Sequence, residues 1–480
     1  MPLILGTNSI KDTGFNVDNS YFIGADAKTS ITNTTPTNTK KFTISFWIKI
    51  HEFPTSGGDR PIFGYYSDGN NQSYMYLRND GTLGIFENES GNTKLDFRTT
   101  QVLRDPSAFY NIIMAIDTSQ GTASNRLKLY INGSQVTTFN AENYPAQDYA
   151  SQLNENSLVF NVGGTATNDG NHIKGTFCEF AFIDGQQLDQ TSFGEFDEDT
   201  PTVFKPISLS TLTFGNNGFL LEFKESGSSA NSSGIGADTS GNNRHHSVTN
   251  IVATDQRTDT CTNNFATLNP LNVPTSNLPT YSEGNLKVVT AGGASAKYYG
   301  GASTIGVSSG KWYAEFKPTD NASQAMIGIS FDPANDARLN YYTGQSASGY
   351  GYYGSTGNTW NNNSDSSYGN SYANDDIIGV AMDLDNSKLY FSKNGTFQNS
   401  GDPTSGSTGT GAISITAGET YFFQVTDQTS VPTATISCNF GSPPFSISSG
   451  NADGEGFGNF EYAVPSGYFA LCSKNLAEYG

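Results

Sequence analysis

Alternating apolar and polar positions along the chain predict β-strands throughout its length. In residues 41–50, KFTISFWIKI, the side chains of Phe42, Ile44, Phe46 and Ile48 fall on one face, and polar or mixed side chains fall on the other. Period two is typical of a strand with at least one buried face. Similar short runs follow to about residue 205, separated by turn sequences such as SDGNNQ, NDG and NESGN. Strands at this spacing indicate a β-sandwich or barrel.

A second set of alternating runs begins near residue 286. The clearest are GKWYAEFKP (310–318), AMIGISFD (325–332) and DIIGVAMDLD (376–385). Between the two sets, turn-rich sequence such as GSSANSSGIGADTSGNNRHHS shows little periodicity, which is typical of an extended connector. The predicted organisation is a sandwich over 1–205, a connector over 206–285, a second sandwich over 286–447 and a C-terminal tail over 448–480.

The two sets share one hairpin sequence. Residues 128–134 read KLYINGS and residues 388–396 read KLYFSKNGT, each after a long apolar run. Asn-Gly tolerates positive φ at both central positions of a type I′ turn, so both sequences predict a β-hairpin. The Asn394-Gly395-Thr396 triplet is also a glycosylation acceptor, but such triplets arise by chance in a chain so rich in Asn, Ser and Thr. The hairpin interpretation is therefore favoured over a sugar-attachment site.

Charge and composition narrow the classes of partner. The chain of 480 residues has 25 Lys and Arg against 45 Asp and Glu, a formal net charge of −20. A surface of that sign repels phosphate backbones, which argues against a nucleic-acid partner. No apolar run reaches the 18 residues of a membrane span, so no membrane insertion is predicted. The N-terminal MPLILGTNSIKDTG lacks the basic start and long apolar core of a signal peptide.

The four cysteines, Cys178, Cys261, Cys438 and Cys472, show no CxxC spacing. Neither a zinc site nor a disulfide framework is indicated by this pattern. We expect buried free thiols, with pairing of Cys438 and Cys472 as the open alternative.

Strand texture adds a resemblance to two known families. FTISFWIK, LKLYINGSQ and GTFCEFAFIDGQQL resemble a LamG or concanavalin A-like lectin domain. GKWYAEF, YGYYGSTGNTW, DDIIGVAMDLDNSKLYFSKNGTF and CNFGSPPF resemble a SPRY domain, in that family's order. Both families are β-sandwiches. The resemblance therefore implies an all-β chain of two β-sandwich (concanavalin A-like jelly-roll) domains joined by an extended connector.

The combination of the two domains carries a further resemblance. FGEFDEDT (193–200), FGNNGFLLEF (214–223), TCTNNFATLNP and the closing PSGYFALCSKNL are similar to tailed marine bacteriophage virion proteins with concanavalin A-like domains. This implies a non-enzymatic virion protein, assembled in the host cytoplasm: a tail fibre, appendage or head-surface decoration. Its expected partners are other virion subunits and a host-surface glycan or protein, and the expected assembly is a homo-oligomer, with trimers common. A purely structural cement protein and a glycan-degrading enzyme are the alternatives.

The acidic sequence GEFDEDT is the main candidate for catalysis. Laminarinase-type glucanases share the sandwich and carry E-x-D-x-x-E on one strand, which places nucleophile and acid/base carboxylates together. Glu195 and Asp197 fit that pattern, but Thr200 stands where the second glutamate belongs. We therefore predict an acidic turn and no catalytic residues.

Ligand sites are expected in loops. No resident cofactor is predicted, and calcium is left open because TNDGNH (167–172) and DPANDAR (332–338) offer oxygen ligands without a defining spacing. Sugar binding requires an aromatic face for the pyranose ring and amide or carboxylate groups for its hydroxyls. The candidate ligand-binding residues are Asn340, Tyr341, Tyr342 and Trp360.

Overall fold

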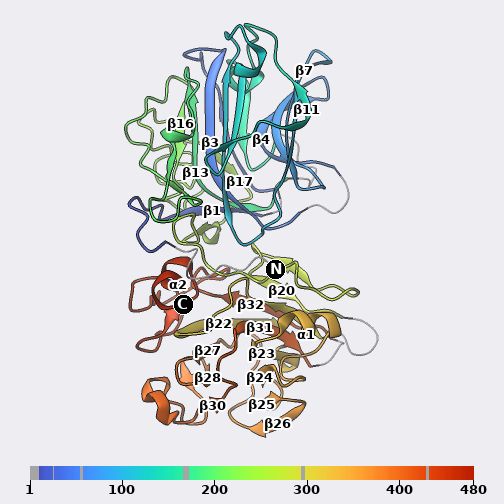
Figure 1. The fold of residues 1–480 in the computed structure, drawn as a ribbon, viewed down its shortest axis with the longest axis vertical. Helices are drawn as coiled ribbons and strands as arrows, with labels where there is room; N and C mark the ends of the chain where they lie inside the picture. Colours follow the sequence, from blue (N-terminus) through green and yellow to red (C-terminus); the bar gives the residue numbers. More distant parts are fainter. Residues whose placement is uncertain (1–9, 25, 54–57, 166–171, 293–297, 429–431) are drawn as a thin grey trace. The chain divides into compact units, whose positions relative to one another are not determined.

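In the computed structural model, the regular secondary structure consists almost entirely of β-strands (Figure 1). It describes residues 10–24, 26–53, 58–165, 172–292, 298–428 and 432–480. The α-helices of these residues, α1 (Pro333–Leu339) and α2 (Ser473–Tyr479), are short, and none of the described helices has the length and apolar run needed to cross a membrane. The chain divides into two compact units, residues 13–263 and residues 264–480 together with 10–12.

The unit of residues 13–263 is a sandwich of two eight-stranded sheets. The first sheet runs β10 (Ser134–Gln135), β9 (Leu127–Ile131), β8 (Phe109–Asp117), β3 (Lys41–Ile50), β13 (Gly175–Asp184), β1 (Ser20–Ile23) and β18 (Gln256–Arg257), with β16 (Phe219–Leu221) paired to β13. The second runs β11 (Phe139–Asn143), β7 (Asn92–Val102), β6 (Thr82–Glu89), β5 (Asn71–Leu77), β4 (Arg60–Asp68), β12 (Val159–Val162), β2 (Lys28–Thr32) and β17 (Ser247–Thr249). A separate ribbon pairs β14 (Gly194–Phe196) with β15 (Phe204–Pro206).

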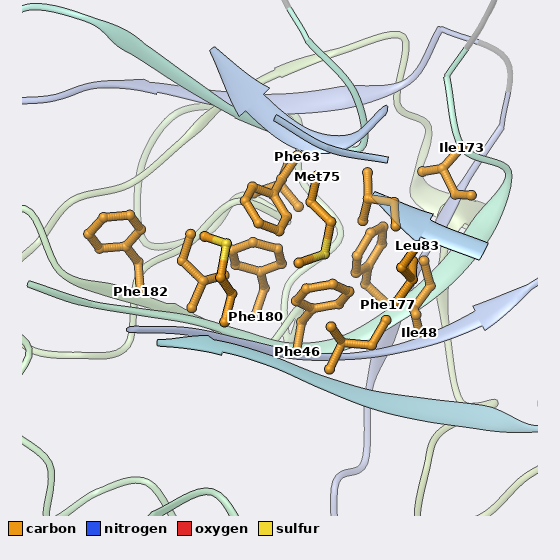
Figure 2. Packing of buried hydrophobic residues seen from close by; sticks show 14 of the residues in the cluster. Phe46, Ile48, Phe63, Met75, Leu83, Ile173, Phe177, Phe180 and Phe182 are labelled. Atoms are coloured by element: carbon orange, nitrogen blue, oxygen red, sulfur yellow. The ribbon is translucent and has the colours of Figure 1, made fainter. Parts of the chain in front are cut away.

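Phenylalanine rings fill the space between these two sheets (Figure 2). Phe46 of β3 stacks on Phe180 of β13 with ring centroids 5.2 Å apart and meets Phe63 of β4 edge-on at 5.8 Å. Offset and edge-to-face pairs of this kind add about 0.5–1.5 kcal/mol each beyond their buried area. The inner face predicted for residues 41–50 is therefore confirmed.

The outer face of β3 is buried as well. Trp47 stacks on Phe204 at 6.0 Å, and the fully buried ammonium of Lys49 forms an ion pair with Asp259 at 2.7 Å. Asp259 belongs to residues 256–263, called the strap here, which begins at the edge of the first sheet with Gln256–Arg257 and reaches the outer face of β3 at Asp259. The segment that covers this face must also supply a negative charge, because an uncompensated ammonium group in the interior costs several kcal/mol.

The segment predicted as a connector is divided between the two units. Within it, β16 pairs with β13, β17 with β2 and β18 with β1, so residues up to 263 add strands to the first sandwich. From residue 264 onward the chain belongs to the second unit.

The second unit is also a two-sheet sandwich. Its larger sheet runs β19 (Thr280–Ser282), β20 (Lys287–Val289), β32 (Thr435–Asn439), β22 (Lys311–Asp320), β27 (Ile378–Asp383), β28 (Lys388–Lys393) and β29 (Thr396–Phe397), with β30 (Ile413–Ser414) on β28 and β33 (Phe469–Ala470) on β22. The smaller runs β21 (Tyr299–Ala302), β31 (Phe422–Asp427), β23 (Ala325–Ser330), β24 (Gly349–Tyr353), β25 (Asn358–Asn361) and β26 (Ser364–Ser367). The prediction of an all-β chain with two sandwich domains is confirmed.

The repeated hairpin has the same turn in both units. Asn132 and Gly133 connect β9 to β10 with φ of 48° and 75°, and Asn394 and Gly395 connect β28 to β29 with φ of 47° and 77°. Positive φ at both central positions defines the type I′ turn that matches strand twist. The hairpin interpretation is confirmed at both places.

The turn asparagines also close the ladder to the preceding strand. Asn132 donates its backbone N–H to the Asn111 carbonyl at 2.9 Å, and its Oδ1 accepts the Asn111 N–H at 2.8 Å. Asn394 makes the same two bonds with Ile377, each at 2.8 Å. One side chain thus favours the left-handed backbone and satisfies a strand end, which explains why the two units share this sequence.

We expect Asn394→Ala to destabilise the second unit by about 2 kcal/mol, because it loses the bond from the Ile377 N–H and leaves a β-carbon residue at positive φ. Asn394→Gly removes the bond without the backbone cost and should lose about half as much. Urea unfolding of both variants measures the two contributions. Equal stabilities for the two variants would contradict the assigned backbone cost.

Candidate functional site

The predicted ligand loop begins where α1 ends. The carboxylate of Asp332 accepts the Asn335 N–H and so caps the helix start. Asn340 ends the helix in the left-handed conformation, with φ of 57°, and is only 3% exposed. Its Oδ1 accepts the backbone N–H groups of Tyr298 and Tyr299, both at 2.9 Å. The side chain of Asn340 therefore holds the backbone of residues 298 and 299 and does not offer this oxygen to a ligand.

Tyr342 and Trp360 belong to one chain of aromatic rings. Tyr342 meets Tyr298 edge-on at 5.5 Å and Trp360 at 5.7 Å, and Trp360 meets Tyr353 at 6.5 Å. Tyr342 is 6% exposed, its hydroxyl donates to Asn363 Oδ1 at 2.6 Å, and burial raises its pKa. Trp360 is partly exposed, and its Nε1 has no hydrogen-bond partner among the residues that the structure describes.

A buried polar network holds this loop in place. The carboxylate of Asp336 accepts hydrogen bonds from the hydroxyls of Ser330 and Ser346 at 2.7 and 3.0 Å, and burial raises its pKa. Thr343 donates its N–H to Thr426 of β31 at 2.8 Å. Of the four predicted residues, Asn340 and Tyr342 are thus supporting groups, whereas Tyr341 and Trp360 are partly exposed and remain available for contact.

The calcium candidate that the structure describes in full is part of a helix. Residues 332–338 form the start and body of α1, where Asp332 caps the helix and Asp336 is hydrogen-bonded inside the protein. Of the other candidate, residues 167–171 lie outside the described residues, and His172 is buried. Within the described ranges, no group of three or more His, Cys, Asp or Glu could hold a metal ion.

The acidic sequence GEFDEDT lies on the ribbon of β14 and β15. Glu195 and Asp197 both form ion pairs with Lys205, at 3.5 and 3.3 Å. Asp197 Oδ1 accepts the backbone N–H groups of Thr200 and Asp199, and the bond from Thr200 is the main reason that its pKa is lowered. A general acid at neutral pH needs a raised pKa, so this arrangement is that of a turn closed by its own carboxylate.

The second sheet of the first unit carries an aromatic cluster that the sequence reasoning missed. Met75, Ile85 and Phe97 point into the core, so their strand neighbours point to the opposite face. There Tyr74 lies 5.4 Å from Tyr76 and 5.9 Å from Phe86, measured between ring centroids. These three residues, the aromatic platform, come from β5 and β6, and Tyr74 and Phe86 are partly exposed.

Carboxylates lie beside the hydroxyl groups of the platform. Burial, followed by the nearby charges of Asp59 and Asp96, raises the pKa of Tyr74 to about 12. The same causes raise the pKa of Tyr76. Both hydroxyls are therefore neutral donors at physiological pH, with acceptors close by.

Guanidinium groups complete this surface. Burial raises the pKa of Asp59, and the positive charges of Arg78 and Arg98 oppose that rise. Arg98 lies on β7 two residues after Asp96, so both side chains share the outer face of the sheet. Aromatic faces, carboxylates and guanidinium groups thus meet on one sheet surface.

A glycine within a strand marks the platform in the sequence. A β-carbon on Gly84 would lie 2.1 Å from Cζ of Tyr76, so the tyrosine ring occupies the space that any other residue would fill. Glycine inside a strand often signals such a close approach. The sequence TLGIF therefore contained a local signal that alternation alone did not reveal.

Glu179 is the most perturbed carboxyl group of the first unit for which a value is resolved. It sits at an irregularity of β13 with φ of 43° and is 5% exposed. Burial and the neighbouring carboxylate of Glu222 raise its pKa to about 8, while Lys224 acts in the opposite direction. Because Glu179 is buried and lies apart from the exposed surfaces described above, its protonation should affect the stability of the first unit.

We expect Glu179→Gln to stabilise the first unit relative to the parent protein, and to do so more strongly at pH 9 than at pH 5. The folded carboxyl keeps its proton to about pH 8, against an ordinary value of 4.5. The stability that this proton contributes is fully present below about pH 4.5 and is lost as the pH rises through 8. The loss in the free energy of unfolding is on the order of a few kcal/mol. Thermal unfolding of variant and parent at both pH values measures the difference. The exposed Glu198→Gln is the control, and a Glu179→Gln effect independent of pH would contradict the assignment.

Comparisons with known proteins agree with this architecture. Residues 24–190 match the concanavalin A-like lectin/glucanases superfamily, in its laminin G group, and residues 311–420 match the SPRY domain. The chain therefore contains a LamG/concanavalin A-like domain and a SPRY domain, as the resemblance implied. The aromatic platform lies within the first match and Trp360 within the second. No curated protein matches the chain in sequence.

The comparison with solved structures gives matches of low sequence identity that cover part of this chain. The SPRY domain of human HERC1 is 18% identical, with 33% of this chain and 91% of that chain covered and a TM-score of 0.27. A heptameric SAP-like pentraxin from Limulus polyphemus is 17% identical, with coverages of 36% and 79% and a TM-score of 0.27. A putative carbohydrate binding protein from Bacteroides ovatus is 13% identical, with coverages of 51% and 60% and a TM-score of 0.33.

Proposed function

We propose that this protein binds carbohydrate and that the aromatic platform of its LamG domain is the main binding surface. The observation that carries the proposal is the meeting of Tyr74, Tyr76 and Phe86 with charged groups on one face of the sheet. An aromatic ring covers the C–H face of a pyranose, and carboxylates and guanidinium groups bond its hydroxyls. Asp59 and Asp96 supply acceptors, and the Arg98 guanidinium supplies donors.

The partly exposed rings of the SPRY domain are proposed as a second contact surface. Tyr341 and Trp360 are accessible there, and Asn340, Tyr342 and Asp336 hold the loop and rings in position. Because a fixed site loses less entropy on binding, this support favours recognition of a host glycan or protein.

Hydrolysis of the glycan is the second candidate function. It is favoured by the raised pKa of Asp59 and by the presence of a second carboxylate, Asp96, near the same tyrosine, Tyr74, since glycosidases use two carboxyl groups with different pKa values. We propose binding without cleavage as the first function, because Arg78 and Arg98 next to Asp59 favour its ionised form.

Binding to a panel of immobilised neutral and acidic oligosaccharides tests the platform. We expect Tyr74→Ala and Gly84→Ala to lower affinity about tenfold, the first by removing a stacking ring and the second by displacing Tyr76. Arg104→Ala, an exposed arginine of the same domain outside the platform, is the matched control and should bind as the parent does. Unchanged midpoints of thermal unfolding would show that the variants are folded.

Several outcomes of this experiment count against the proposal. If the parent binds no glycan, or if Tyr74→Ala binds as tightly as the parent, the platform is not the binding surface. Loss of binding in Trp360→Ala but not in Tyr74→Ala would move the site to the SPRY domain. Release of reducing ends by the parent, abolished by Asp59→Asn, would favour the hydrolase.

We further propose that the protein acts in a virion, as a host-attachment or surface-decorating subunit of a tailed marine phage. In this proposal it forms a homo-oligomer and assembles with other virion subunits in the host cytoplasm. Its support is the sequence similarity of FGEFDEDT, FGNNGFLLEF and PSGYFALCSKNL to such proteins.

We expect cryo-electron microscopy of intact virions to place this chain in an outward-projecting fibre, appendage or knob, with Tyr74 and Trp360 facing solvent. Density with both sandwiches wedged between neighbouring subunits and these aromatics buried would contradict attachment and leave a structural cement protein. Oligosaccharide binding by the isolated chain is measured separately, so the two proposals can fail independently.

A further inference from the structure

The strap is held on the first sheet by contacts at both of its ends. At its start, Arg257 pairs with Ser20 of β1, and at its end Thr262 Oγ1 accepts the Val17 N–H at 3.0 Å and donates to the Val17 carbonyl at 2.9 Å. Between them lies the ion pair of Asp259 with Lys49. The strap therefore has a defined position over the outer face of β3 and β13.

Two thiols from distant parts of the sequence meet under this strap. Cys178 lies on β13 opposite Trp47 of β3, in an apolar cluster with Val17 and Phe204, and Cys261 of the strap packs against the same cluster. Cys178 is therefore near Cys261, and after burial its proximity is the next cause that raises the pKa of the Cys261 thiol. Both are free thiols, Cys178 buried and Cys261 partly exposed.

The other two cysteines lack this arrangement. Cys438 belongs to the main core of the second unit, whereas Cys472 belongs to a different cluster with Tyr313 and Phe460. Both are buried and neither is in a disulfide bond, so the alternative pairing of Cys438 with Cys472 is not formed.

We propose that Cys178 and Cys261 are a redox-active dithiol that a small-molecule disulfide converts to a reversible intramolecular disulfide. The Cys261 thiolate attacks the reagent, forms a mixed disulfide and releases one reagent thiol. The Cys178 thiolate then attacks the Cys261 sulfur and releases the second. Two protein thiols are oxidised to one disulfide while the reagent is reduced to two thiols.

Oxidation of this pair would lock the strap covalently to β13. The bond would close the long loop between residues 178 and 261, which restricts the unfolded chain and stabilises the folded unit. Burial raises the pKa of the Cys261 thiol, so the reaction should be slow at neutral pH and faster at mildly alkaline pH, where more thiolate is present.

Oxidised glutathione is the probe, applied to the native full-length protein at mildly alkaline pH. After alkylation of the remaining thiols, we expect intact mass to show the loss of two hydrogen atoms and non-reducing peptide mapping to show one cross-link, between Cys178 and Cys261. The midpoint of thermal unfolding of this unit should rise by roughly 5–10 °C in the oxidised protein and return to its original value on reduction.

Several outcomes would overturn the proposal. Complete alkylation of both thiols after equilibration with oxidised glutathione would show that the pair does not react, and a stable glutathione adduct on Cys261 alone would show that Cys178 cannot resolve it. A cross-link to Cys438 or Cys472, or between two chains, would also contradict it. These results come from the parent protein, and Cys178→Ser and Cys261→Ser are each expected to abolish the cross-link.

Discussion

Strand β3 is the constraint on which the first sandwich depends, because it is hydrogen-bonded on both edges and buried on both faces. Its inner side chains, with Phe46 at the centre, fix how the two sheets pack. Its outer face contains Lys49, and an ammonium ion in the interior must have a counter-charge. Asp259 provides that charge at 2.7 Å, so the position of a distant segment follows from one buried lysine.

The sequence predicted features that depend on near neighbours. Alternation placed a strand over residues 41–50, where β3 lies, and Asn-Gly located both type I′ turns. The aromatic platform could not be predicted in this way, because Tyr74 and Phe86 come together only through the register of β5 with β6. Gly84 was the one feature of the local sequence that indicated the platform.

Long-range packing also decided which residues of the predicted loop are accessible. From the sequence, Tyr342 was expected to contact a ligand. In the structure its ring packs against Tyr298 and Trp360, and its hydroxyl donates a hydrogen bond to Asn363. Asn340 is occupied by backbone groups of residues 298 and 299. Local sequence contains no sign of partners so far away, so burial at these positions became visible only in the folded chain.

The hydrogen bonds between Val17 and Thr262 have a consequence for the history of the chain. They bring together the two ends of the unit that spans residues 13–263, while residues on either side of it, 10–12 and 264–480, belong to the other unit. A domain whose entry and exit are adjacent can be inserted into a host fold, or removed from it, without opening either core. The LamG domain thus has the geometry of a transferable module, one that recombination could exchange while the sandwich that receives it remains intact.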